Sequence, residues 1–528
     1  MKSIVAIAFV AGLLATAPVP ALAQFENVGS IDFPTSATGE AQQHFLRGVS
    51  ILHSFGWEQA IEEFHRAQEI DPDFAMAYWG ESLAYNHPLV SQMDKTEPSK
   101  VLQRLGPTRE ARLATAPTDR EQGFLGAVEV LWGEGDHVER RVGYMEAMTD
   151  LHERYPEDSE VAAFYALSML SAVAATGDLS QRLNMRAGAI ATKLMAEHPD
   201  HPGAVHYAIH AFDDPLHAPL ALEAAYRFAD IAPAVSHARH MPTHIFIQHG
   251  MWERVSTHNQ SAYDAARALW DPGEAMGDAI HALDWGQYGD LQKGDYEKAR
   301  LWIDRIEAMA NQGGFLEGGP RGEPGAARAV TTLALTRSRY VVETEEWEIG
   351  PVNGDVSTNE LLATALSAAR LGDEAALTEA EAELGRRAEA AGGEGTTQVM
   401  YRQAGALLHA GMGHGDYAAS LMDEAVAIIE AAAPPRGAAS PIKPVFELYG
   451  EILLDLDRPA DAVGRFETSL LRMPNRPRSL LGLARAHVAL GNEAKAAEAY
   501  RTLSEVWAGH DEFDGLREAQ RFLRETEN

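Results

Sequence analysis

The sequence of 528 residues contains no cysteine. This absence excludes disulfide bonds, thiolate metal ligands and a cysteine nucleophile, so packing alone must hold the chain together. Positive charge is also scarce: 44 lysine and arginine residues stand against 77 aspartate and glutamate residues, which gives a formal net charge of −33. Phosphate backbones would repel such a surface, so we expect no nucleic-acid partner, whereas a cationic partner or a metal ion suits it.

Common catalytic motifs and long apolar runs are missing too. The chain has no H-E-x-x-H, P-loop or G-x-S-x-G motif. Near the start, an apolar run over residues 4–15 follows Lys2, and the Ala-Leu-Ala of residues 21–23 ends the segment. This order is typical of a cleavable secretory signal over residues 1–23, and the run is too short to cross a bilayer. We therefore expect a periplasmic or secreted protein without membrane insertion.

A 34-residue spacing recurs at both ends of the chain. Near the N-terminus, "FLRGVSILHSFGWEQAIEEFHRAQEIDP" has the spacing of positions 8, 20, 24, 27 and 32 of a tetratricopeptide repeat at Gly48, Ala60, Phe64, Ala67 and Pro72. Near the C-terminus the same offsets recur at Gly450, Ala462, Phe466 and Pro474, and 34 residues further on at Ala484, Ala496 and Tyr500. Small residues let two helices approach, the aromatic ring fills the gap, and proline ends the second helix. The sequence therefore predicts an all-α solenoid of tetratricopeptide helical hairpins.

Glycine- and proline-rich stretches interrupt this pattern. The run "NQGGFLEGGPRGEPG" occupies 311–325, and "AAPPRGAASPIKP" occupies 432–444. Neither composition favours a helix. We expect an N-terminal array with a histidine-rich groove over residues 24–310, a loop or linker over 311–357, and a C-terminal array over 358–528.

Two histidine pairs follow the same 34-residue spacing. "HYAIH" at 206–210 and "HMPTH" at 240–244 each carry histidines four residues apart. Four residues are about one helical turn, so each pair lies on one face of its helix. Equivalent positions of neighbouring repeats stack side by side. The four imidazoles are therefore expected to form a two-by-two patch.

Such a patch suits a transition metal. Imidazole nitrogens bind at about 2.0–2.1 Å, and a site without thiolate favours copper, zinc or nickel. The four histidines could hold one ion or two, with His206, His210, His240 and His244 as ligands. Further candidates are His237, His281, Asp213, Asp284, His53 and His87. Of these, Asp213 could orient a ring, and a hydrolase would need Asp213 or Asp284 beside the metal.

The segments "HPGAVHYAIHAFDDP", "HARHMPTHIF", "DPDFAMAYWGE" and "KPVFELYGEILL" resemble a family of exported bacterial tetratricopeptide-repeat proteins. The resemblance implies that the histidines line the concave groove of the solenoid. It implies no particular reaction. Two functions stay open: a scaffold that binds a peptide or protein partner in this groove, or a copper- or zinc-binding protein or metalloenzyme that uses the stacked histidine pairs.

Charged residues near the C-terminus fall at or next to groove positions of the last full repeat. They are Lys443, Glu447 and Glu451. They could contact the terminus of a ligand in the groove, but we expect a solvated face here.

Overall fold

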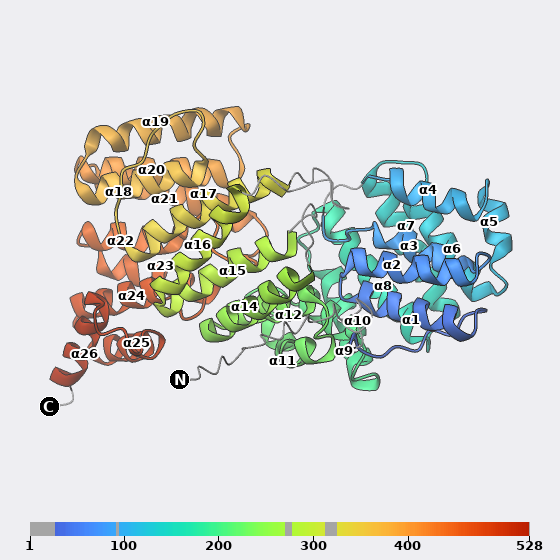
Figure 1. Ribbon diagram of the computed structural model, residues 1–528. Coiled ribbons are helices and arrows are strands. Elements are labelled where there is room, and N and C mark those ends of the chain that lie inside the picture. The colour runs from blue at the N-terminus through green and yellow to red at the C-terminus, as the bar shows by residue number, and fades with distance from the viewer. Residues whose placement is uncertain (1–26, 91–93, 270–276, 312–324, 527–528) are drawn as a thin grey trace, which may run out of the picture.

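The computed structural model describes residues 27–90, 94–269, 277–311 and 325–526 (Figure 1). Over these residues the protein is all-α, and its helices follow one another as stacked hairpins. This confirms the predicted fold class. The predicted secretory signal, residues 1–23, lies outside the described residues.

The helices fall into three consecutive stretches. The first comprises α1 Gly39–His53, α2 Trp57–Ile70, α3 Ala75–Ala84, α4 Thr96–Leu105, α5 Arg109–Thr115, α6 Asp119–Leu131, α7 His137–Arg154, α8 Ser159–Thr176 and α9 Arg182–Glu197. The middle stretch comprises α10 Pro202–Ala211, the 3-10 helix η2 Ala218–Ala221, α11 Leu222–Ile231, α12 Ser236–His240, α13 Pro242–Gln248, α14 Trp252–Leu269, α15 Gly277–Lys293, α16 Tyr296–Asn311 and α17 Gly325–Thr344. The last comprises α18 Thr358–Leu371, α19 Glu374–Ala390, α20 Gly395–Gly411, α21 Gly415–Ala431, α22 Val445–Asp455, α23 Pro459–Arg472, α24 Pro477–Ala489, α25 Glu493–Val506 and α26 Asp514–Thr526.

Neighbouring helices pack as a solenoid requires. Helices adjacent in the chain contact one another, and α1 also contacts α3, as α18 contacts α20 and α20 contacts α22. Contacts between first neighbours and second neighbours are the mark of stacked helical hairpins. In Figure 1, α18 to α26 lie at one end of the molecule and α1 to α8 at the other.

The repeat signature has the packing that its spacing predicts. The Phe64 ring lies between two glycines: a Cβ on Gly48 would come 2.8 Å from Cε1 of the ring, and a Cβ on Gly80 would come 2.4 Å from it. At the other end, Phe466 lies in the same way between Gly450 and Gly482, where a Cβ would come within 2.7 and 2.3 Å of ring atoms. Any larger residue would displace the ring, so glycine is required at these contacts.

One part of the predicted linker is helical. Helix α17 lies inside the stretch 311–357 and packs against α15 and α16, and its Arg339 is buried. The prediction of a loop is wrong for this helix. The predicted loop extends too far along the chain, because it includes the Ala- and Leu-containing helical segment that follows the glycine-rich run. The residues between Thr344 and Thr358 are not helical.

By length and composition, one described helix could cross a membrane. It is α8, and most of it is buried inside the protein. A core helix surrounded by other helices is apolar all round and passes the same test. Its contacts with α7, α9 and α10 account for its composition without a bilayer.

The second histidine pair lies on two short helices rather than one. Helix α12 ends at His240, and α13 begins at Pro242. Proline has no N–H to donate to the preceding turn and its ring crowds that turn, so the helix breaks there. Met241 between them keeps helical dihedral angles, so His240 and His244 stay on one face.

Candidate metal centre

Six histidine rings lie together where α10, α12, α13 and α15 meet. They form what we call the histidine array: His206, His210, His237, His240, His244 and His281. Ring centroids of neighbours in the array are 4.3 to 6.0 Å apart. The array therefore contains all four histidines of the two predicted pairs and two of the further candidates.

The array divides into two groups of three. The first triad is His206, His210 and His237, and the second triad is His240, His244 and His281; within each, one potential ligand atom per residue lies within 4.8 Å of the others. The predicted two-by-two patch therefore becomes two three-histidine sites. His237 and His281 each complete one of them, because they enter from the starts of α12 and α15 beside the pairs.

In the first triad, His206 and His210 are buried and His237 is half-buried, and three of its ring nitrogens lack a hydrogen-bond partner. His206 is fully buried, and its Nδ1 donates to the backbone oxygen of His53 at 2.6 Å. This bond fixes the tautomer and leaves a lone pair on Nε2. The Nε2 atoms of His206, His210 and His237 are all buried without a partner. Buried polar atoms are normally paired, so three such atoms in one group point to a ligand.

In the second triad, two lone pairs face each other. Asn259 donates from Nδ2 to the oxygen of Val255 at 2.8 Å, so its Oδ1 accepts from Nδ1 of His240 at 2.7 Å. The Nδ1 of His244 donates to a carboxylate oxygen of Asp213 at 2.7 Å. In neutral rings held this way, both Nε2 atoms are acceptors. They lie only 3.2 Å apart.

A bound ion would turn this repulsion into ligation. Two imidazole nitrogens bound to one tetrahedral ion at about 2.0–2.1 Å are about 3.3 Å from each other. The observed separation of 3.2 Å between the Nε2 atoms of His240 and His244 matches that spacing. The Asp213–His244 hydrogen bond is the kind of outer contact that orients metal-bound histidines.

Burial keeps four rings of the array neutral, which is their metal-binding form. Burial lowers the pKa of His206 to about 3. Burial, with the neighbouring His244, lowers the pKa of His240 to about 3 as well. Burial followed by the charge of neighbouring rings takes the pKa of His210 and of His237 well below the ordinary value. These rings therefore do not need to lose a proton near pH 7 before they bind an ion.

Other predicted candidates lie elsewhere. Asp284 forms an ion pair with Arg339, with 2.8 Å between Oδ1 and Nη1. The ring of His87 packs against Trp57, with 4.7 Å between the centroids, and is in none of the potential ligand groups among the described residues. The structure thus bonds Asp213 to the array, whereas Asp284 is paired with Arg339 and His87 packs against Trp57.

His53 belongs to a separate polar network in the core. Its Nε2 lies 2.8 Å from Glu160, its Nδ1 lies 2.7 Å from the hydroxyl of Tyr207, and His201 Nε2 lies 3.1 Å from the same glutamate. Burial opposes ionisation of Glu160, but His201 and His53 outweigh it and lower its pKa to about 2. His201 also caps α10 by accepting from the N–H of Ala204. We interpret this group as structural, since His53 and His201 both have polar partners within the protein.

The expectation of an open, histidine-lined groove is wrong at the array. His206, His210 and His240 are buried. The loop 432–444, between α21 and α22, packs beside them: its Pro435 oxygen accepts from Gln248 at 2.9 Å. Ala439 joins the apolar core of the N-terminal array. The repeat spacing gives no sign that a loop so far along the chain folds back here.

Trp285 connects this loop to the second triad. A Cβ on Gly437, which has a φ of +83°, would lie 2.2 Å from the Trp285 ring. That ring lies 5.0, 4.3 and 5.6 Å from the three rings of the second triad. The tryptophan thus has the loop on one side and the ligands on the other.

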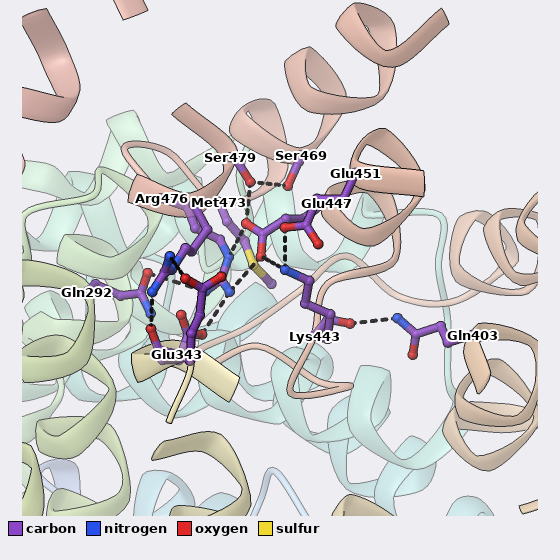
Figure 2. Close-up of polar contacts among 12 residues, drawn as sticks. Gln292, Glu343, Gln403, Lys443, Glu447, Glu451, Ser469, Met473, Arg476 and Ser479 are labelled. Atoms are coloured by element: carbon purple, nitrogen blue, oxygen red, sulfur yellow. Dashed lines mark hydrogen bonds and ion pairs between the residues drawn. The ribbon is translucent and has the colours of Figure 1, made fainter. Parts of the chain in front are cut away.

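The far end of the loop is fixed by buried charges, shown in Figure 2. Lys443 Nζ lies 3.0 Å from Glu447 and 2.6 Å from Glu451, and Gln403 donates to the Lys443 oxygen at 2.8 Å. The predicted solvated face is therefore wrong, because Lys443 and Glu447 are both buried.

Arg476 is the centre of the same network. Its guanidinium contacts Glu447 at 2.7 Å and Glu343 of α17 at 2.8 Å (Figure 2). Burial opposes ionisation of Glu447, but Arg476 and Lys443 outweigh it and hold its pKa below the ordinary value. The unpredicted helix α17 supplies Glu343, and this explains why the sequence did not reveal a buried ion network.

Three residues that shape the array were not singled out from the sequence. Asn259 fixes the tautomer of His240, Trp285 lies against the second triad, and Phe55 lies against the first triad with ring centroids 4.3, 5.7 and 5.4 Å away. None of the three belongs to a sequence motif. Only Trp285 could have been suspected from the sequence, because the phase of the repeats places it one residue from a groove position.

Neither a protein-family model nor a curated protein sequence matches the chain. Among solved structures, the chain is similar to the Cut9–Hcn1 hetero-tetramer of the APC/C at 11% identity and a TM-score of 0.33, covering 92% of this chain and 76% of that one. It is also similar to yeast Tom70, at 10% identity and a TM-score of 0.29 over 92% and 96% of the two chains. A tetratricopeptide-repeat protein from Parabacteroides merdae matches at 12% identity and 0.27, over 56% and 99%. Likeness at this level concerns the fold alone, and the repeat architecture rests on the packing of this chain.

Proposed function

We propose that this protein binds transition-metal ions, copper or zinc, through the two histidine triads. The observation that carries the proposal is the pair of Nε2 atoms of His240 and His244, 3.2 Å apart, with both Nδ1 hydrogens committed to other acceptors. Two Nε2 lone pairs at this distance repel each other unless a metal ion or a proton lies between them. The three unpartnered Nε2 atoms of the first triad support the same conclusion.

The donor set narrows the choice of ion. Every ligand in the two triads is an imidazole, which suits copper, zinc or nickel and disfavours calcium, magnesium and manganese. Three protein ligands leave a tetrahedral ion one open position, as in catalytic rather than structural zinc sites.

A peptide-binding scaffold is the alternative. Solenoids of this class offer extended concave surfaces to protein or peptide partners. The burial of His206, His210 and His240, together with the loop 432–444 beside them, argues against a peptide lying on the array itself. A partner surface would have to lie elsewhere on the solenoid.

We also propose that the protein is exported to the periplasm or beyond. This proposal rests on the signal-like segment 1–23 alone.

Metal content tests the proposal directly. Untagged protein, stripped with a chelator, is titrated with Cu(II) or Zn(II), desalted and analysed by inductively coupled plasma mass spectrometry. We expect the parent to retain metal in stoichiometric amounts and a His206→Ala/His240→Ala variant to lose it. Circular dichroism checks that the variant keeps its helices.

A matched control excludes surface binding. His409 and His414 form a second close pair, with 3.3 Å between their Nδ1 atoms, but at the surface. A His409→Ala/His414→Ala variant must retain the metal of the parent. The proposal fails if the parent retains neither metal, or if the surface pair accounts for all of it.

A further inference from the structure

We infer that the two triads form one coupled dinuclear copper centre whose ions share a small bridging anion. The inference rests on the proposed function, since it requires both triads to bind metal. It goes further by assigning the two ions to a single centre and by naming the class of ligand that joins them. The geometry of the six rings carries it.

Five rings of the array form a closed circuit. In order they are His206, His210, His244, His240 and His237, and the consecutive centroid distances are 4.7, 5.7, 5.1, 6.0 and 5.2 Å. The two steps that cross from one triad to the other, 5.7 and 6.0 Å, fall within the range found inside the triads, which reaches 6.5 Å. The triads are therefore halves of one ring of imidazoles.

This circuit brings the two ions close together. An ion bound to an imidazole lies about 3.2 Å from the ring centroid. Two rings that bind one tetrahedral ion have centroids about 5.2 Å apart, so His210 and His237, at 6.5 Å, approach each other slightly when an ion binds. The His244 ring lies 5.7 Å from the His210 ring, and the His240 ring lies 6.0 Å from the His237 ring, so an ion bound by the second triad lies in the same circuit as the first ion. Two-metal sites with shared ligands typically hold their ions about 3.5–4 Å apart.

Charge requires an anion between the ions. Two Cu(II) ions would bring four positive charges into the array, and the Asp213 carboxylate that is hydrogen-bonded to His244 offsets one of them. Asp284 is already paired with Arg339, and the nearby Arg436 adds positive charge at His210. Uncompensated charge in a buried site is costly, so a bound anion lowers the energy of the filled centre.

The walls of the centre favour a small anion. The ring of Phe55 lies against all three rings of the first triad, and the ring of Trp285 lies against all three of the second. Each triad thus has an apolar wall of its own. A hydroxide or another anion of a few atoms adds negative charge with the least displacement of these aromatic rings.

The electron paramagnetic resonance signal of Cu(II) allows the coupling between the two ions to be measured. An isolated Cu(II) ion gives an electron paramagnetic resonance signal, whereas two Cu(II) ions that share a bridge pair their spins and lose most of it. We expect the protein loaded with two equivalents of Cu(II) to show several-fold less signal than its copper content. A His281→Ala variant, which weakens the second triad, should hold less copper and regain the full signal per copper ion.

Azide tests the shared ligand. One azide per protein should saturate the change in the optical spectrum if it bridges both ions, and His198→Ala, at an exposed histidine outside the array, should behave as the parent does. Two bound copper ions with undiminished signal, or two azides per protein, would overturn the coupled centre and leave metal binding intact. One copper per protein would also overturn it. No copper at all would instead remove the proposed function.

Discussion

Acid should unfold the metal-free protein through the buried histidines. His206 has a pKa of about 3 in the folded protein, against 6.5 for an ordinary histidine. Between pH 7 and pH 5 the unfolded chain takes up a proton at this residue and the folded chain does not, so stability falls as the pH falls. The size of the effect is about 2 kcal/mol for this one residue over that interval. His240, with the same folded pKa, adds a similar amount.

The assay compares the parent with a His206→Phe variant in the presence of a chelator. Phenylalanine keeps an aromatic ring beside Phe55 and Phe228 but cannot titrate. Urea unfolding, followed by circular dichroism at pH 7 and pH 5, gives the free energy of unfolding of each protein. The loss of the hydrogen bond to His53 affects both pH values equally and cancels in the difference, as does the effect of the net charge.

The parent should therefore lose about 2 kcal/mol more than the variant between pH 7 and pH 5. Equal losses in the two proteins would refute the reasoning, since they would mean that His206 titrates in the folded state as it does in the unfolded one. A larger loss in the variant would refute it as well.

Four further outcomes follow from the structure. Asp213→Asn should weaken metal binding to the second triad by about 10–100-fold in calorimetric titration, because His244 loses its carboxylate partner. Glu447→Gln should lower the free energy of unfolding by about 3–5 kcal/mol in urea titrations, because it leaves Arg476 and Lys443 short of a buried countercharge. Gly482→Ala should cost about 1–3 kcal/mol, since its Cβ would lie 2.3 Å from the Phe466 ring. Gly464→Ala, in a helix with nothing within 4 Å, should instead stabilise the protein by up to about 1 kcal/mol.

Much of the fold could be predicted because the repeat carries its own spacing. The glycine–phenylalanine offsets at both ends of the chain correspond to the same ring-between-glycines packing at Phe64 and Phe466. Helix α17 was missed because a glycine-rich run precedes it and no repeat phase extends across that run. The buried network at Arg476 was missed for the same reason, since Glu343 comes from α17.

The sequence predicted which residues form the candidate site better than it predicted how they are arranged. Spacing alone placed His206, His210, His240 and His244 side by side, and the structure brings all four into the array. Spacing could not show that these histidines belong to two triads, because the two triads depend on where α12 ends and on where α15 packs beside the array. Nor could it show that the loop 432–444 packs beside them, because such a contact leaves no periodic trace in the sequence.

X-ray absorption at the copper or zinc edge tests the central claim most directly. The account predicts that the metal-loaded protein shows imidazole scattering from about three nitrogen ligands per ion at about 2.0–2.1 Å. The surface variant His409→Ala/His414→Ala should give the same spectrum. A first shell made mainly of oxygen, or a spectrum unchanged by His206→Ala/His240→Ala, would contradict the claim that the two histidine triads hold the metal.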